Sequence, residues 1–301
     1  MDSSDLKIIE VIRVPILINK ERVSDYLPGQ LNTIYSKKGV KKAIKEGLVT
    51  INDKKAFTAD YLFGNEKITL FQSTIVNNKK TITIKLEIVF EDDYLAIINK
   101  PAGILVSGNK KYTIENALPL ALKKSKQQDS LERPLPIHRL DYPTSGLLVI
   151  GKTSRSVILL NRMFENKEIQ KFYEAVTIGQ QKEHGIINSP INTKKSKTTF
   201  RVVERLNSIK YQNLNLVELI PHTGRTHQLR KHMSKIGNPI FGDQQYGIEG
   251  LKSVGNGLYL QASKLIFTHP FTENKIEISI PRLKKTNKLF PEKKAEFKIF
   301  H

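Results

Sequence analysis

The residues best suited to chemistry lie in one short stretch, which reads HRLDYPTSGLLV from His138 to Val149. Its proline and glycine mark a turn, and the apolar residues that follow predict a buried strand. A carboxylate on such a turn, beside the fixed charge of Arg139, stays ionised and well aimed. Asp141 is therefore a candidate nucleophile or base. The alternative is a structural Arg–Asp pair at a strand edge, because ion pairs are far more common than catalytic pairs.

Two further stretches carry residues that could serve the same site. Residues 171–178 alternate in polarity and predict a strand, on which Tyr173 and Ala175 share one face. The stretch GRTHQLRKHM, residues 224–233, predicts a tight turn and then a helix over 226–236 that Gly237 ends. On that helix His227 and Arg230 are three residues apart, so they project together.

A metal site is not expected. The chain has seven histidines and no cysteine, so thiolate ligands are excluded. His227 and His232 are separated by about 140° around a helix and cannot bind one metal from one face. We therefore predict neither a metal nor another cofactor.

Together these stretches resemble the signatures of the RluA-type RNA pseudouridine synthases. The matching elements are HRLD followed by TSG, a K-x-Y-x-A segment, and the GRTHQ-x-R block with its PI-x-GD continuation. The resemblance implies an α+β fold with a mostly antiparallel mixed β-sheet. It implies that Asp141 is catalytic, that Tyr173 stacks on the target base and is a candidate for proton transfer, and that the Arg230 guanidinium pairs with Asp141.

The resemblance also assigns roles around these three residues. Arg139 is linked to base flipping, and Arg225 is expected to bind backbone phosphate or to brace the site. His138, Thr144 and His227 are expected to support it. The reaction breaks the bond between uracil nitrogen and ribose and rejoins the base through carbon 5, so nothing is oxidised and no cofactor is needed. The target uridine must first leave its stack.

Composition agrees with an RNA partner. The chain has 301 residues, 39% hydrophobic, with a formal net charge of +20, which favours a polyanionic ligand. A lysine-rich solvated surface would give the same charge. No apolar run is long enough for a membrane span, and the polar N-terminus is unlike a secretory signal. We expect a cytoplasmic monomer.

Four segments are predicted: a leader at 1–12, a small α/β module at 13–73, a linker at 74–84 and a catalytic domain at 85–301. In the module, Ser36 is expected to cap a helix from Lys37 to Glu46. Its basic stripe consists of Lys38, Lys41, Lys42 and Lys45. With the text AIKEGLVTIN that begins at Ala43, the module is similar to the αL RNA-binding motif shared with the fourth protein of the ribosomal small subunit. An ordinary basic helix packed on a hairpin is the alternative.

Within the catalytic domain, residues 109–133 are expected to be helical, and residues 180–210 to form short strands at best. The function predicted from the sequence is an RNA pseudouridine synthase, with large-subunit ribosomal RNA favoured as substrate and transfer RNA as the alternative. A non-catalytic RNA-binding or ribosome-assembly factor and a metal-dependent nuclease are the competing hypotheses.

Overall fold

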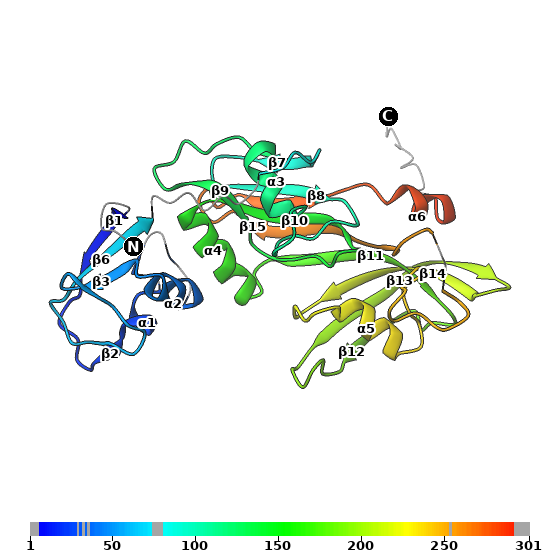
Figure 1. Cartoon of the computed structure of the whole chain (residues 1–301). Coiled ribbons are helices and arrows are strands. Elements are labelled where there is room, and N and C mark those ends of the chain that lie inside the picture. Colours follow the sequence, from blue (N-terminus) through cyan, green and yellow to red (C-terminus); the bar gives the residue numbers. More distant parts are fainter. Residues whose placement is uncertain are drawn as a thin grey trace, which may run out of the picture.

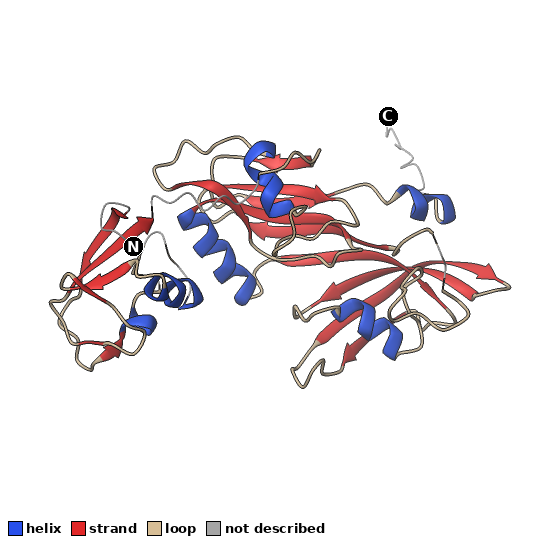
Figure 2. Ribbon diagram, in the orientation of Figure 1, coloured by secondary structure: helices blue, strands red, loops and turns tan. Residues whose placement is uncertain are grey.

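The computed structural model describes residues 6–28, 30–31, 34, 37–73, 81–252 and 255–291. These residues form a small N-terminal unit and a larger domain built on one long sheet (Figure 1). Strands dominate, and the few helices are short (Figure 2). The expected α+β class with a mostly antiparallel sheet is therefore confirmed. Among the described residues, no helix is long and apolar enough to cross a membrane.

The N-terminal unit contains a four-stranded sheet in the order β1-β6-β3-β4 and a separate pair, β2 with β5. Its elements are β1 Leu6–Arg13, β2 Glu21–Arg22, α1 Val23–Tyr26, α2 Lys37–Lys45, β3 Val49–Ile51, β4 Lys54–Lys55, β5 Tyr61–Leu62 and β6 Lys67–Ser73. The leader predicted at 1–12 is wrong for residues 6–12, because β1 pairs antiparallel with β6 along its length. The remainder of that leader and Ser36 lie outside the described residues.

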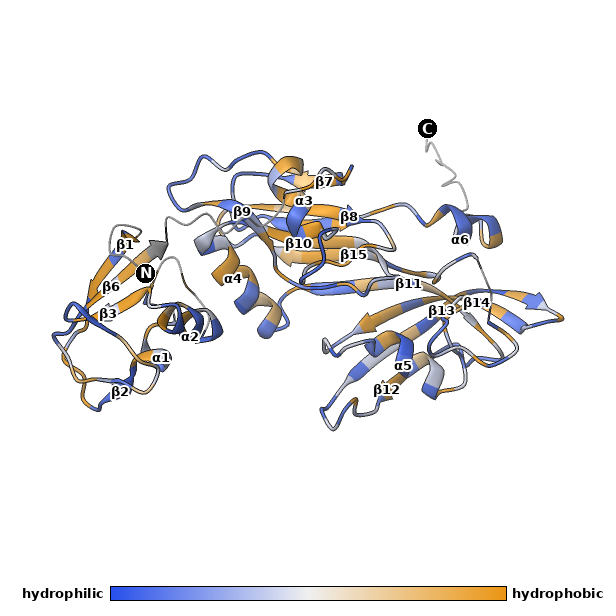
Figure 3. Cartoon of the chain, viewed as in Figure 1, coloured by the Kyte–Doolittle hydropathy of each residue, from blue (hydrophilic) through white to orange (hydrophobic). Residues whose placement is uncertain are grey.

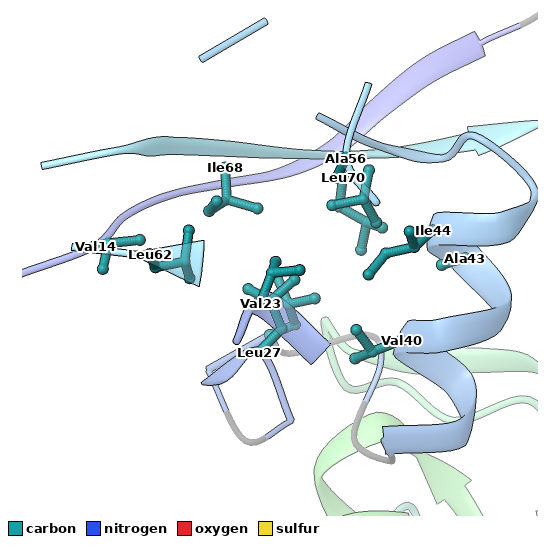
Figure 4. Close-up of a cluster of buried hydrophobic side chains, with 12 residues drawn as sticks. Val14, Val23, Leu27, Val40, Ala43, Ile44, Ala56, Leu62, Ile68 and Leu70 are labelled. Carbon is teal, nitrogen blue, oxygen red and sulfur yellow. The ribbon is translucent and has the colours of Figure 1, made fainter. Parts of the chain in front are cut away.

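Helix α2 is amphipathic, as its sequence predicts. Val40, Ala43 and Ile44 are buried against Leu70 and the rest of the unit's core (Figure 4). The lysines of the basic stripe lie on the opposite, exposed side. Gly47 follows with a φ of 74°, a left-handed conformation that ends the helix with little strain.

The larger domain has a ten-stranded sheet whose main path is β12-β13-β14-β11-β15-β10-β8-β7, with β16 beside β15 and β9 beside β10. Its strands are β7 Glu87–Glu91, β8 Leu95–Lys100, β9 Ser130–Pro136, β10 Ser145–Thr153, β11 Gln170–Ile178, β12 His184–Asn188, β13 Lys197–Ser208, β14 Gln212–Pro221, β15 Leu260–Thr268 and β16 Lys275–Ser279. The pairing of β10 with β15 is parallel, whereas the other pairings of this sheet are antiparallel.

Strand β10 explains why its sequence is apolar without interruption. Leu147 and Val149 face one core, which the helix α4, Ser154–Glu165, covers. Leu148 and Ile150 face a second core, under the helix α3, Ile114–Ala121. A strand buried on both faces has no polar side, and the hydropathy colouring shows this band of apolar strands (Figure 3).

The sequence also predicts how α4 begins. The Thr153 side chain accepts from the Ser156 backbone, and the Ser156 side chain accepts from the Thr153 backbone, which is a complete capping box. The remaining helices of the domain are α5 Gln228–Lys235 and α6 Lys284–Leu289.

Two local expectations are wrong. Residues 180–210 contain β13, a strand of 12 residues that pairs with β14; one of its faces is largely exposed, which made its sequence resemble a loop. The expected helix at 109–133 is restricted to α3, and β9 occupies its end. The expected linker packs on the catalytic domain at its end, where buried Ile82 donates its N–H to the Asn116 carbonyl over 3.1 Å. Residues 74–80 of that linker lie outside the described residues.

Candidate active site

Asp141 lies on the turn before β10, as its sequence predicts. The Thr144 N–H donates to the Asp141 carbonyl over 3.0 Å and closes the turn. Gly146 follows with a φ of 116°, and a Cβ on it would lie 2.3 Å from the Ala262 carbonyl oxygen. Only glycine fits so close to the backbone of β15, so the turn is fixed to the middle of the sheet.

A cavity of about 490 Å³ opens over this turn. It brings together residues from the β10 turn, β11 and the start of α5, which are far apart in the sequence. Its lining includes each site residue predicted for the catalytic domain: His138, Arg139, Asp141, Thr144, Tyr173, Arg225, His227 and Arg230. The lysine stripe of α2 does not contribute to it.

Two side chains of the α5 segment face the Asp141 carboxylate. His227 Nε2 lies 3.8 Å from Oδ1, and Arg230 Nη1 lies 4.0 Å from Oδ2. The i, i+3 spacing predicts that these two project together, and this is what is seen. His227 precedes the helix in a left-handed conformation, φ 57°, so α5 begins later than the sequence suggested.

The main partner of Arg230 is not the expected one. Its Nε and Nη2 donate to the two carboxylate oxygens of Asp243 over 2.7 and 2.8 Å. Asp243 is buried, and its Oδ1 also accepts from the Gln245 and Tyr246 backbones. The expected ion pair with Asp141 is present, at 4.0 Å from Nη1, but the bidentate fork binds another carboxylate. Asp243 holds the fork, and the remaining nitrogen faces Asp141.

This arrangement keeps Arg230 and Asp243 charged. Burial would lower the pKa of Arg230, but the hydrogen bonds and negative charge of Asp243, with Asp141 further away, raise it. Burial would raise the pKa of Asp243, but the bond from Arg230 and the backbone donors lower it. The result is a buried anchor with a permanent positive charge close to Asp141.

Tyr173 borders the cavity from β11. Burial raises the pKa of its hydroxyl, and the negative charge of Asp141 raises it further. The hydroxyl therefore stays protonated at neutral pH and can donate a hydrogen bond. This favours a stacking and donating role over that of a base.

The supporting residues have different surroundings. His138 Nε2 accepts from the Val149 N–H over 3.1 Å, and burial, with the nearby charge of Lys171, lowers its pKa to about 3. It is thus a neutral anchor of the strand that follows Asp141. Thr144 is buried, whereas Arg139 and Arg225 are exposed at the rim, where Arg225 Nε donates to the Lys195 carbonyl over 3.2 Å.

Sequence reasoning missed Asp243, Tyr246 and Lys100. Asp243 and Tyr246 stand in the motif that follows α5, but their residue types gave no indication of a partner. Lys100 is fully buried at the end of an apolar strand, where burial lowers its pKa to about 8 against the opposing charge of Asp141. A lysine in that position was a usable signal.

A second groove of about 500 Å³ continues from the cavity and shares Arg225 and Lys171 with it. Lys167 and His222 extend it outward. The charges of Lys167, Lys171 and Arg225 outnumber the carboxylate of Glu165 in this groove, and such a lining is suited to a chain of phosphates.

Comparisons agree with this geometry. The chain matches the family described as RNA pseudouridylate synthase over residues 94–235. It is 30% identical over 291 residues to a ribosomal large subunit pseudouridine synthase C of Vibrio cholerae serotype O1 (strain ATCC 39315 / El Tor Inaba N16961). That match covers 87% of this chain and 89% of the relative. It is 36% identical over 221 residues to a tRNA pseudouridine synthase C of Pasteurella multocida (strain Pm70), covering 64% and 90%. The solved structure of human RNA pseudouridylate synthase domain containing 1 has the same fold, with a TM-score of 0.54 at 24% identity over 65% of this chain and 83% of that one.

Proposed function

Because this chain belongs to the RNA pseudouridine synthase family and isomerises uridine in RNA, we propose that Asp141 is its catalytic aspartate. The supporting observation is the position of its carboxylate, on the lining of the cavity and within 4.0 Å of both His227 and Arg230. The guanidinium of Arg230 places a fixed positive charge opposite the carboxylate that would act as nucleophile or base.

Tyr173 and Arg139 are proposed to assist the isomerisation in two different ways. The bond between N1 of uracil and C1′ of ribose breaks, a bond from C5 to C1′ forms, C5 loses a proton and N1 gains one. We propose that Tyr173 supports the detached base with its ring and donates a hydrogen bond with its hydroxyl. Arg139, exposed at the rim beside Asp141, is proposed to enter the space that the flipped uridine leaves.

For the substrate, we propose large-subunit ribosomal RNA. The Vibrio cholerae enzyme named for that substrate matches 87% of this chain, whereas the enzyme named for tRNA matches 64%. The N-terminal unit, whose described strands run from β1 to β6, is proposed to bind RNA through the exposed lysines of α2. We propose that the enzyme acts as a monomer in the cytoplasm, where such RNA is modified.

The test is to incubate the protein, without added metal, with transcripts of large-subunit ribosomal RNA and with transfer RNA. Uridine isomerised at unchanged mass, mainly in the ribosomal transcript, is the expected result. The matched control is Asp141→Asn, which keeps the size of the side chain and removes its charge. Preferential modification of transfer RNA would overturn the substrate proposal, and turnover by the Asn variant would overturn the role of Asp141.

A further inference from the structure

Tyr246 contacts both of the groups that face Asp141. Its hydroxyl lies 2.9 Å from His227 Nδ1. Its ring lies under the Arg230 guanidinium, with Cζ 4.9 Å from the ring centroid. Its own N–H donates to Asp243 over 3.0 Å, which ties it to the same anchor that holds Arg230. A single half-buried side chain thus connects the two neighbours of the carboxylate.

The contact of Nδ1 with the Tyr246 hydroxyl, together with the Asp141 carboxylate 3.8 Å from Nε2, bears on which nitrogen of the His227 ring carries the proton. Burial, together with the charges of Arg230 and Lys231, lowers the pKa of His227 against the opposing effect of Asp141 and Asp243, so the ring is neutral at neutral pH. A neutral imidazole has one N–H. The carboxylate facing Nε2 can only accept, which favours the proton on Nε2 and leaves Nδ1 to accept from the Tyr246 hydroxyl.

The backbone of His227 supports a fixed role for this ring. Its φ of 57° and ψ of 27° place a non-glycine residue in the left-handed region at the start of α5. Such a conformation costs free energy, so it persists only where contacts with neighbouring residues hold the backbone in place. It is found more often at functional sites than elsewhere. Here it aims the ring between Asp141 and Tyr246 rather than along the helix.

We propose that Tyr246 is a positioning residue for the isomerisation: its hydroxyl holds His227 as the Nε2–H tautomer directed at Asp141, and its ring holds the Arg230 guanidinium opposite the same carboxylate. This inference rests on the proposed role of Asp141. Tyr246 is not among the residues that line the cavity, whereas His227 and Arg230 are, so its influence on the reaction passes through those two side chains.

The experiment compares Tyr246→Phe, which keeps the ring and loses the hydroxyl, with Tyr246→Leu, which loses both. In metal sites, loss of a residue that hydrogen-bonds and orients a ligating histidine reduces metal affinity or activity by roughly 10-fold to 100-fold, and we take the same range for a residue that orients His227. We expect roughly a 10-fold lower single-turnover rate at saturating RNA for the Phe variant, and a loss toward 100-fold for the Leu variant. RNA affinity should stay within a few-fold, because phosphates dominate it.

A spectroscopic measurement separates positioning from mere support of the fold. The nitrogen chemical shifts of the His227 ring should report Nε2–H in the parent protein and a mixture of tautomers in Tyr246→Phe. The matched control is Tyr211→Phe, whose ring packs on Phe241 in the same half of the sheet; it should change neither the shifts nor the rate. Thermal unfolding of each variant identifies any loss that comes from unfolding.

Parental His227 shifts or a parental rate in Tyr246→Phe would overturn the inference. Turnover by Asp141→Asn would instead overturn the proposed function, and the positioning role with it, even where the His227 tautomer is as expected. The two failures are distinguishable because the tautomer is measured without any reaction.

Discussion

At the scale of the residue, Asp141 carries the strongest expectation. Asp141→Asn should abolish turnover and leave RNA affinity within a few-fold, because most affinity comes from phosphate contacts. Single-turnover kinetics and binding titrations with the same RNA measure the two effects. A variant that binds poorly but still reacts would assign the carboxylate to recognition instead of chemistry.

Arg230→Lys should be far from conservative. An ammonium cannot reproduce the two parallel hydrogen bonds to Asp243. Asp243 is only 2% exposed, so one of its carboxylate oxygens would lose a hydrogen bond that water cannot replace. We expect a loss of about 1–3 kcal/mol in the free energy of unfolding, together with a large fall in rate. Urea unfolding and single-turnover kinetics measure both. The matched control is Arg201→Lys, an exposed arginine 3.3 Å from Glu218, which should be nearly neutral. Parental stability of Arg230→Lys would show that the fork to Asp243 contributes little.

His138 makes stability depend on acid. Its pKa is about 3 in the folded protein and 6.5 in the unfolded chain, so the unfolded state takes up the proton first. Above pH 6.5 His138 is neutral in both states and does not lower the free energy of unfolding. As the pH falls from 6.5 toward 3, that free energy decreases by at most about 1.4 kcal/mol per pH unit. His138→Gln cannot titrate, so its free energy of unfolding between pH 7 and 4 should have a flatter slope. Exposed His184→Gln is the control, and equal slopes for His138→Gln and the parent would contradict the prediction.

Residue types and spacing predicted the lining of the cavity but not its internal bonding. Asp141, Tyr173 and Arg230 were identifiable because motif and periodicity mark them. The partner of Arg230 was not, because Asp141 and Asp243 are both carboxylates, and only the fold shows which one meets the fork. Tyr246 was not identifiable for the same reason, since its importance lies in contacts between distant segments, whereas Lys100 was marked by its position at the end of an apolar strand.

At the scale of the element, α2 offers a test that separates the proposed RNA binding from catalysis. Its stripe, Lys38, Lys41, Lys42 and Lys45, is exposed and lines neither the cavity nor the groove. Replacement of the four by glutamine should lower RNA affinity, and each replacement should reduce the slope of log affinity against log salt by about 0.7–0.9. Lys42 should contribute least, because its Nζ lies 3.7 Å from Glu46. Titrations at several salt concentrations test this, with Lys275→Gln, next to Glu277, as the control. An unchanged slope would exclude the stripe from RNA binding.

Elements with a clear apolar period were predictable from sequence, and elements with one solvated face were less so. The apolar face of α2, opposite its lysine stripe, and the uninterrupted apolar run of β10 each indicate burial directly. Strand β13 does not, because its polar face is exposed and its pairing with β14 is carried by backbone groups that leave no mark in the sequence. Pairing partners depend on the whole sheet.

At the scale of the whole molecule, the two units should be separable. Removal of residues 1–80 keeps Thr81 and Ile82, which bond to Arg133 and Asn116 of the catalytic domain. The truncated protein should unfold cooperatively, bind RNA more weakly and with a shallower salt slope, and still convert a short substrate at high concentration. Circular dichroism, titrations and turnover assays check each part. A truncated protein that folds but is inactive at all substrate concentrations would place part of the catalytic function in the N-terminal unit.

The parallel pairing of β10 with β15 has a consequence for how the protein is made. Ser145 pairs with Gln261 and Gly146 with Ala262, so the turn that carries Asp141 is fixed by a strand that is synthesised long after β10. Such non-local contacts form late and slowly. During translation, β10 leaves the ribosome long before its neighbour does. The nascent chain therefore cannot present a finished catalytic centre to the RNA around it, and activity begins only after β15 has been synthesised and has paired with β10.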